Sequence, residues 1–286
     1  MEYSIEVSNL CKDYSDFSLK NISFALPKGC IMGFIGENGA GKTTSIKAVL
    51  DIVHKKSGNV KILGQEFSGK EKEIKERIGV VFDESHFHEE LTPKNISKIL
   101  SGIYKTFDKE LFTDYLVRFN LPYTKKIKEF SRGMKMKFSI AAALSHKPEL
   151  LILDEPTSGL DPVVREEILD IFLDFIQDEN HSILISSHIT SDLDKIADYI
   201  TFIHEGRIIL SEPRDELISS SGILKCGEDD LSSLDKSDMI KIRRNQFGCE
   251  VLIKNRQSFM ENHPDLVVDT PNIESIMLMY IKGDSI

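Results

Sequence analysis

The sequence contains no long apolar segment. Its apolar runs, such as residues 150–153 and 183–185, fall far below the roughly 18 to 20 residues that a membrane-spanning helix needs. Residues 1–4 lack the basic start and apolar stretch of a secretory signal peptide. We therefore expect neither a spanning helix nor a cleaved leader.

Positive charge and cysteine are also scarce. Lysine and arginine number 36 against 46 aspartates and glutamates, which gives a formal net charge of −10. This balance argues against a protein that coats nucleic-acid phosphates, because such binding depends on a basic face, so we expect no nucleic-acid partner. The four cysteines show no CxxC spacing, which is typical of reduced thiols in a cytosolic protein and not of a cysteine metal site.

What is present describes a globular chain. Its 286 residues are 41% apolar and 29% charged, which are ordinary values for a folded protein. The length allows one large domain or two smaller ones. Because the sequence pattern shifts near residue 212, we place one domain at residues 1–215 and an accessory region at 216–286.

Short apolar runs without polar alternation indicate strands that are buried on both faces, as in a parallel sheet covered by helices. Such runs occur at 31–35, 78–82, 150–153, 183–185 and 199–203. Between them apolar residues recur at helical spacing, as in 163–178, where Pro162 marks a helix start. Residues 86–147 show only helix-like patterns and predict a helical insertion. The fold class is therefore α/β.

The two ends of the chain follow other patterns. Residues 1–29 alternate apolar and polar side chains, which predicts β structure. The accessory region has predicted strands at 239–243, 249–253 and 266–268 and a final helix at 273–281. It is therefore expected to be a small α+β extension. Met277 and Met279 of that helix either pack against the body of the protein or contact a dimer partner.

Residues 36–43 read GENGAGKT and fit the phosphate-binding pattern G-x-x-x-x-G-K-[ST]. An apolar strand precedes this segment and a helical stretch at 44–53 follows it, as the pattern requires. The glycines let backbone N–H groups turn toward phosphate oxygens, aided by the helix N-terminus. We expect Lys42 to reach the β- and γ-phosphates and the Thr43 hydroxyl to bind Mg²⁺. The predicted nucleotide contacts here are Gly36, Asn38, Gly39, Ala40, Gly41, Lys42, Thr43 and Thr44.

A predicted buried strand at 150–153 ends in two adjacent carboxylates, Asp154 and Glu155. In open α/β sheets, ligands bind at the carboxyl ends of the strands. Asp154 is suited to the Mg²⁺ shell, and Glu155 is suited to polarising a water for in-line attack on the γ-phosphate. This pair is a weak indication alone and a strong one beside the phosphate-binding segment.

Three further segments read FSRGM at 130–134, SGLD at 158–161 and SSH at 186–188. With the two motifs above, this set resembles the ATP-binding cassette (ABC) ATPases over about residues 1–215. The resemblance implies a P-loop NTPase fold of the ABC type, with a mixed, largely parallel sheet flanked by helices. It also implies an N-terminal antiparallel β-subdomain and an inserted helical subdomain.

The resemblance further implies that two cassettes, identical or related, close around ATP. Ser131 and Gly133 of the signature segment would contact the γ-phosphate of ATP bound to the opposite subunit, and Asp161 belongs to the adjoining D-loop. A second subunit is needed because the phosphate-binding loop covers the nucleotide from one side only. The added hydroxyl and amide donors would close and dry the site before hydrolysis.

By the same resemblance, His188 would contact the γ-phosphate from the subunit that binds the nucleotide. The predicted catalytic residues are therefore Lys42, Glu155 and His188. Tyr14 occupies the position of the aromatic that stacks on adenine in this family. Phe17 is close enough in sequence to compete for that role, so ordinary strand packing of Tyr14 remains an alternative.

Two sites depart from the family's usual residues. The signature normally reads LSGGQ, and here Arg132 and Met134 replace its third and fifth residues. The serine and second glycine are kept, in a variant that resembles bacterial antibiotic- and peptide-exporting cassettes. Asp83 stands where the family usually has a glutamine that contacts Mg²⁺ and the attacking water. It could approach the metal, but it adds a negative charge beside the two predicted site carboxylates.

The resemblance implies the ATP-hydrolysing subunit of an ABC membrane transporter, with ATP and Mg²⁺ as cofactors and separate transmembrane permease subunits as partners. Such a subunit would lie at the cytoplasmic face of the cell membrane. Residues 272–277 resemble the closing helix of ABC-2 exporters of peptides, antibiotics and other amphipathic compounds. The alternative is a soluble ABC ATPase that acts on ribosomes or DNA, although such proteins usually carry two cassettes or a long coiled-coil insertion.

Overall fold

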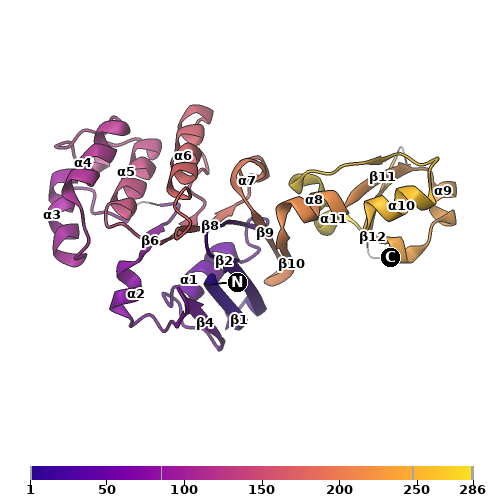
Figure 1. The fold of residues 1–286 in the computed structure, drawn as a ribbon, viewed down its shortest axis with the longest axis horizontal. Helices are drawn as coiled ribbons and strands as arrows, with labels where there is room; N and C mark the ends of the chain where they lie inside the picture. The colour runs from indigo at the N-terminus through magenta and orange to yellow at the C-terminus, as the bar shows by residue number, and fades with distance from the viewer. Residues whose placement is uncertain (1, 85, 247, 285–286) are drawn as a thin grey trace.

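A six-stranded sheet forms the centre of the computed structural model, which describes residues 2–84, 86–246 and 248–284 (Figure 1). The strand order is β10-β9-β3-β8-β7-β6. The strands are β3 (Ile31–Ile35), β6 (Ile78–Val81), β7 (Leu150–Asp154), β8 (Ser182–Ser187), β9 (Tyr199–His204) and β10 (Arg207–Pro213). Neighbouring strands pair in parallel, except that β10 is antiparallel to β9. The five predicted apolar runs are confirmed as strands.

Both faces of this sheet are buried. In β3, Met32 and Phe34 belong to the hydrophobic cluster on one face, whereas Ile31 and Ile35 belong to the cluster on the other. A strand covered on both sides has no solvent-facing positions for polar residues. This explains why the central strands read as continuous apolar runs.

An antiparallel sheet of order β2-β1-β4-β5 covers one face. Its strands are β1 (Tyr3–Asp13), β2 (Ser18–Pro27), β4 (Ser57–Ile62) and β5 (Gln65–Glu66), and the short helix α2 (Lys72–Glu76) follows them. Inward side chains such as Ile5, Leu26 and Ile62 are fully buried in the cluster that also holds Phe34. The predicted β structure at the N-terminus is confirmed as an antiparallel sheet.

Helices cover the other face and extend beyond the β6 edge (Figure 1). They are α3 (Pro93–Ile103), α4 (Lys109–Arg118), α5 (Arg132–Leu144), α6 (Pro162–Phe175) and α7 (Thr190–Ile196). Residues 86–147, all of which the structure describes, contain α3 to α5 and a 3-10 turn but no strand, so the predicted helical insertion is confirmed. Pro162 is the first residue of α6, and Asp161 caps that helix by accepting the Val163 and Val164 N–H groups, each at 3.1 Å.

The helix after the phosphate-binding segment differs from the prediction. We expected it at 44–53, but α1 spans Lys42–Val49. Gly41, with φ +113°, ends the loop directly before Lys42, and Asp51, with φ +53°, adopts a left-handed conformation that cannot continue a helix. Lys42 and Thr43 therefore lie in the first helical turn.

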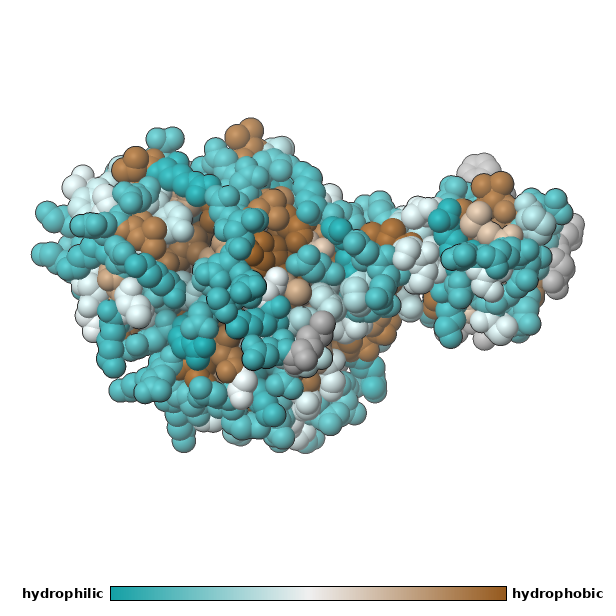
Figure 2. All heavy atoms as spheres, in the orientation of Figure 1, coloured by the Kyte–Doolittle hydropathy of each residue, from teal (hydrophilic) through white to brown (hydrophobic). Residues whose placement is uncertain are grey.

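Residues beyond β10 form a lobe that a narrower part of the molecule joins to the rest (Figures 1 and 2). Its antiparallel sheet has the order β12-β13-β11-β14. The elements are α8 (Arg214–Ser220), β11 (Gly222–Cys226), α9 (Glu228–Ser233), a 3-10 turn (Lys236–Asp238), β12 (Met239–Asn245), β13 (Gly248–Ile253), α10 (Arg256–Asn262), β14 (Val268–Asp269) and α11 (Ile273–Lys282). Helix α8 runs across residue 215, and the proposed domain division there stays a prediction.

Two of the three strands predicted in this lobe are confirmed as β12 and β13. The third was expected at 266–268, but β14 begins at Val268. The prediction was wrong at this end because the N–H group of Leu266 bonds to the carbonyl of His263 at 3.1 Å, which makes a turn and not a strand.

Helix α11 packs between the antiparallel sheet of the lobe and the central part of the protein. Ile276 and Met279 are buried in the same cluster as Leu193 of α7, and the Tyr280 ring centroid lies 5.9 Å from that of Phe202 in β9. Met277 is partly buried against this cluster. The packing interpretation of the two methionines is therefore supported. Among the described residues, no helix is both long enough and apolar enough to cross a membrane.

Candidate functional site

The predicted phosphate-binding loop connects β3 to α1 and depends on its glycines. Gly39 and Gly41 have φ values of +85° and +113°, in the region that glycine adopts most readily. A Cβ atom at Gly36 would lie 2.4 Å from the carbonyl oxygen of Ile203, and one at Gly41 would lie 2.8 Å from the Phe17 ring. The loop therefore fits closely against its neighbours and opens onto the N-terminus of α1, which favours an anionic ligand.

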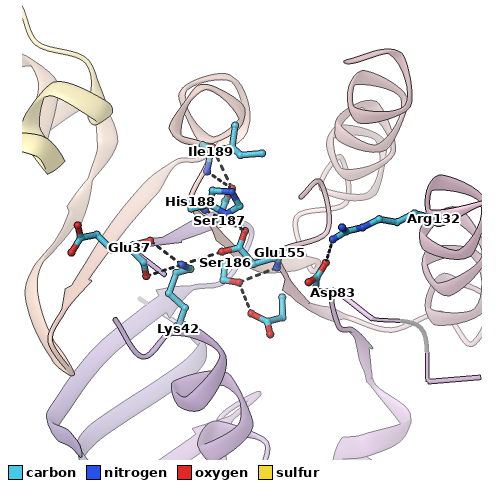
Figure 3. A network of polar contacts seen from close by, with 11 residues as sticks. Glu37, Lys42, Asp83, Arg132, Glu155, Ser186, Ser187, His188 and Ile189 are labelled. Atoms are coloured by element: carbon cyan, nitrogen blue, oxygen red, sulfur yellow. Dashed lines mark hydrogen bonds and ion pairs between the residues drawn. The ribbon is translucent and has the colours of Figure 1, made fainter. Parts of the chain in front are cut away.

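Lys42 points from α1 toward the end of β7 (Figure 3). Its Nζ donates hydrogen bonds to the carbonyl oxygens of Gly36 at 2.8 Å and Glu37 at 3.2 Å, and it lies 3.0 Å from Oε1 of Glu155. The side chain is only 5% exposed. Oxygen atoms thus surround the ammonium group, and phosphate oxygens could replace them.

The two carboxylates at the end of β7 are connected through the neighbouring strand β8. The Ser186 hydroxyl donates to Oδ1 of Asp154 at 2.7 Å and accepts the N–H group of Glu155 at 3.0 Å. Asp154 is buried, with 3% exposure. No role was predicted for Ser186, although a serine at the end of an apolar strand departs visibly from the apolar pattern of that strand.

Glu155 is held from several sides. Its Oε2 accepts a hydrogen bond from ring Nδ1 of His188 at 2.6 Å, while Oε1 faces Lys42. The backbone of Glu155 has φ +52°, which costs an L-residue roughly 1 to 2 kcal/mol. This conformation, together with the two partners, fixes the carboxylate of Glu155 at the cleft (Figure 3).

A cleft of about 750 Å³ lies over these groups. Its lining residues are Tyr14, Phe17, Glu37, Asn38, Gly39, Gly41, Lys42, Thr43, Thr44, Asp83, Glu155, Ser158 and His188. The volume is within the range of small-molecule sites, and the convergence of polar groups on it is typical of a ligand site. Most of the predicted nucleotide contacts thus come together in one place.

Several predicted site residues lie outside the lining of this cleft. Asp154 is buried beneath it, whereas Ser131 and Asp161 are exposed at the N-termini of α5 and α6, where each caps its helix. Gly133 lies in the first turn of α5. In this structure Ser131 accepts the N–H group of Met134 at 3.3 Å.

Tyr14 and Phe17 both line the cleft, so the two candidates for adenine stacking are both present. Tyr14 is 47% exposed, and Nζ of Lys12 lies 4.9 Å from its ring centroid. Phe17 is less exposed and packs against Gly41. The assignment of Tyr14 stays a prediction.

Asp83 lines the cleft just after β6, and its carboxylate pairs with a guanidinium. Oδ1 of Asp83 lies 2.6 Å from Nη2 of Arg132 at the start of α5. Within the described ranges, no three Asp, Glu, His or Cys side chains are grouped to hold a metal ion. Since Mg²⁺ in nucleotide sites uses one or two carboxylates plus phosphate oxygens, Thr43 and Asp154 fit it only together with a bound nucleotide.

The sequence is similar to one family model and to several known proteins. A family model described as ABC transporter matches residues 19–158. The bacitracin transport ATP-binding protein BcrA of Bacillus licheniformis is 38% identical over 220 residues, which cover 76% of this chain and 72% of that protein. The lantibiotic transport ATP-binding protein SrtF of Streptococcus pyogenes is 36% identical over 74% of this chain and 91% of its own length.

A solved structure of an ATP-binding subunit of an ABC transporter also resembles this chain. The two align with a TM-score of 0.68 and 25% sequence identity, over 74% of this chain and 91% of the other. The predicted α/β fold class is therefore confirmed. The relatives described here are named for transport, so the alternative of action on ribosomes or DNA is not favoured.

Proposed function

The chain belongs to the ABC transporter family, in which it is an ATP-binding and ATP-hydrolysing subunit, and we propose that it powers the export of peptide antibiotics or other amphipathic compounds through separate permease subunits. One observation carries the site assignment. Lys42 of α1, Glu155 after β7 and His188 after β8 converge at one cleft beside a glycine loop, and Asp154 is buried at the end of β7 against Ser186. The names of the bacitracin and lantibiotic relatives support the substrate class.

In this proposal the loop 36–41 and the first turn of α1 bind the phosphates of ATP. Lys42 exchanges its contact with Glu155 for the β- and γ-phosphate oxygens. Thr43 and Asp154 would supply oxygen ligands for Mg²⁺, and Asp83, which lines the cleft, would be a further candidate ligand. When bound, Mg²⁺ would neutralise charge on the phosphate oxygens. Tyr14 stacks on the adenine.

Glu155 is the residue that polarises the attacking water. Its carboxylate is anchored by its backbone conformation and lies at the cleft surface with partial exposure. His188 donates to Oε2 and so fixes the direction of the carboxylate, while it also lines the cleft where the γ-phosphate would lie. When the phosphates draw Lys42 away, Oε1 of Glu155 is released to accept a proton from water.

A second cassette completes the site. Ser131 and Asp161 are exposed and do not line the cleft of their own chain. Their positions at two adjacent helix starts, with Gly133 beside them, suit contact with a nucleotide on another subunit. ATP would then hold two subunits together, and hydrolysis would release them.

The family also supports a location at the cytoplasmic face of the cell membrane, through binding to the permease. This is tested by expressing tagged Glu155→Gln in the native host, extracting membranes gently with ATP present, and identifying copurifying proteins. We expect a stoichiometric multi-spanning protein, and a second cassette alongside it if pairing is heteromeric. Recovery with ribosomes or DNA-bound factors and no membrane protein would contradict the transporter assignment.

A further inference from the structure

Two of the residues that depart from the family's usual pattern, Asp83 and Arg132, meet in space. Asp83 follows β6 and Arg132 is the first residue of α5, 49 positions later in the chain. Nη2 of Arg132 donates to Oδ1 of Asp83 at 2.6 Å, and Figure 3 shows the two side chains reaching toward each other across the edge of the site. Neither the aspartate at position 83 nor the arginine at position 132 is explained by the sequence motif in which it lies.

The start of the helical insertion is also tied to α5 and to the 3-10 turn at Ile127–Glu129. Glu89 pairs with Lys135 of α5 at 2.8 Å, and its carbonyl accepts the N–H group of Lys128 at 3.0 Å. Glu90 pairs with Nζ of Lys128 at 2.7 Å. Of these ion pairs, the Asp83–Arg132 pair lies nearest to the cleft. It connects the lining of the cleft to α5, the helix that begins after Ser131.

Charge gives the pair a role at the site. Asp83 and Glu155 line one cleft, and Asp154 lies beneath it. Glu37 also lines the cleft, so an uncompensated carboxylate at position 83 would add to the repulsion of a nucleotide's polyphosphate, since like charges in a partly desolvated cleft interact strongly. The guanidinium of Arg132 compensates the charge of Asp83.

Arg132 also contacts the loop that precedes α6. A Cβ atom placed on Gly159 would lie only 2.6 Å from Nη1 of Arg132, so the guanidinium packs directly against this glycine, which has φ +67°. Gly159 belongs to the loop that ends at Asp161. Arg132 thus bridges the segment after β6 and the loop before α6.

We infer that Arg132 is a positioning residue for Asp83: it compensates that carboxylate at the cleft and ties it to the signature helix α5. The two departures compensate each other, so the arginine in the signature suits a chain with an acid in place of the usual glutamine. This inference rests on the proposed function, because Asp83 faces Mg²⁺ and ATP only if the cleft binds them.

The pair does little for overall stability. The side chains of Arg132 and Asp83 are 53% and 42% exposed, and exposed ion pairs contribute little to the free energy of unfolding. Removal of either side chain should therefore leave the thermal midpoint nearly unchanged. An effect on nucleotide affinity would then report on the site and not on folding.

The test is a double-mutant cycle with Arg132→Gln and Asp83→Asn. The readout is the affinity for trinitrophenyl-ATP in Mg²⁺ divided by the affinity in EDTA. Arg132→Gln leaves the Asp83 charge uncompensated, so metal-free binding weakens and the gain from Mg²⁺ rises about fivefold. Asp83→Asn should abolish this rise, so it should lower the gain from Mg²⁺ at least about threefold more in the Arg132→Gln background than in the parent, where Arg132 already compensates the carboxylate.

Arg118→Gln and Asp174→Asn provide the matched control. These residues form an ion pair at the same 2.6 Å distance with similar exposure, and neither lines the cleft. The control variants should not alter the gain from Mg²⁺. Equal effects of Asp83→Asn in both backgrounds would overturn the inference. If the parent binds the analogue no better than Lys42→Ala, the proposed function fails instead.

Discussion

Ser186 organises both carboxylates of the cleft. Its hydroxyl connects the buried side chain of Asp154 to the backbone of Glu155 through hydrogen bonds of 2.7 and 3.0 Å. A buried carboxylate that loses a donor bears a desolvation cost of about 1 to 3 kcal/mol. A change at this serine therefore acts on a metal-binding candidate and on the water-polarising candidate together.

We predict that Ser186→Ala lowers the rate of ATP hydrolysis about tenfold or more and destabilises the fold by about 1 to 3 kcal/mol. Ser182→Ala is the matched control, because Ser182 is equally buried at the other end of β8, where it bonds to Ser4 and to the N–H group of Gly29. The control should lose similar stability, measured by urea denaturation, but retain its kcat. Equal loss of kcat in both variants would contradict a specific role for Ser186.

For single residues, the sequence predicts which groups carry the chemistry of the site more accurately than it predicts which residues those groups contact. Lys42, Asp154 and Glu155 are recognisable because each occupies a fixed place in a short motif next to a strand. The Asp83–Arg132 pair was not predictable in this way. Its two members are 49 residues apart, and their contact depends on how a helical insertion packs beside the end of β6.

Between elements, His146 connects the end of α5 to the start of β6. Its Nε2 lies 3.0 Å from the carbonyl oxygen of Ile78, and its ring stacks on Tyr104 with centroids 4.1 Å apart. The side chain is buried, and burial lowers the pKa of His146 below its ordinary value of 6.5. The folded state therefore favours the neutral imidazole.

This shift gives a pH dependence with a defined sign. Below pH 6.5 the unfolded chain binds a proton at His146 more readily than the folded chain does. The contribution of this residue to stability is therefore present above pH 6.5, and it is lost as the pH falls toward the lowered pKa of His146 in the folded state. We predict that His146→Gln is less stable than the parent at pH 7.5 and that the difference shrinks by pH 5.5. Urea denaturation at both pH values measures it, and a difference that widens on acidification would contradict the assignment.

The strands were largely predictable where both of their faces are buried. The strands of the central sheet read as apolar runs because helices and a second sheet cover both faces. The prediction was less accurate in the C-terminal lobe, where β14 is two residues long and begins at Val268. A strand of two residues is too short to show an alternation of apolar and polar side chains. Its start follows from the turn between His263 and Leu266.

Considered as a whole, the molecule has a C-terminal lobe with a hydrophobic cluster of its own, around Val251 and Phe259, while α11 and part of the lobe's sheet belong to the cluster of the central sheet. Ile276 of α11 is 2% exposed and lies in one cluster with Leu252 of β13 and Leu193 of α7. The cluster continues from the lobe into the rest of the protein. Unfolding of the lobe should therefore be coupled to unfolding of the nucleotide-binding part.

We predict that Ile276→Ala destabilises the main unfolding transition by about 2 to 5 kcal/mol, as expected for a large-to-small change in a core. Val267→Ala is the control, because Val267 is 78% exposed in the same lobe and should cost no more than about 0.5 kcal/mol. Differential scanning calorimetry distinguishes coupled unfolding of the lobe from independent unfolding. A shift confined to a separate, minor transition would show that the lobe unfolds independently.

The proposed function rests on Glu155 polarising the attacking water in a site that binds ATP through Lys42 and the glycine loop. Its most direct test is the single-turnover rate of ATP hydrolysis by Glu155→Gln, measured beside its ATP affinity and against Glu179→Gln, an exposed position outside the cleft. We predict a rate loss of about 10²-fold or more, with ATP affinity retained and an ATP-bound dimer accumulating. Hydrolysis near the parent rate would contradict the account.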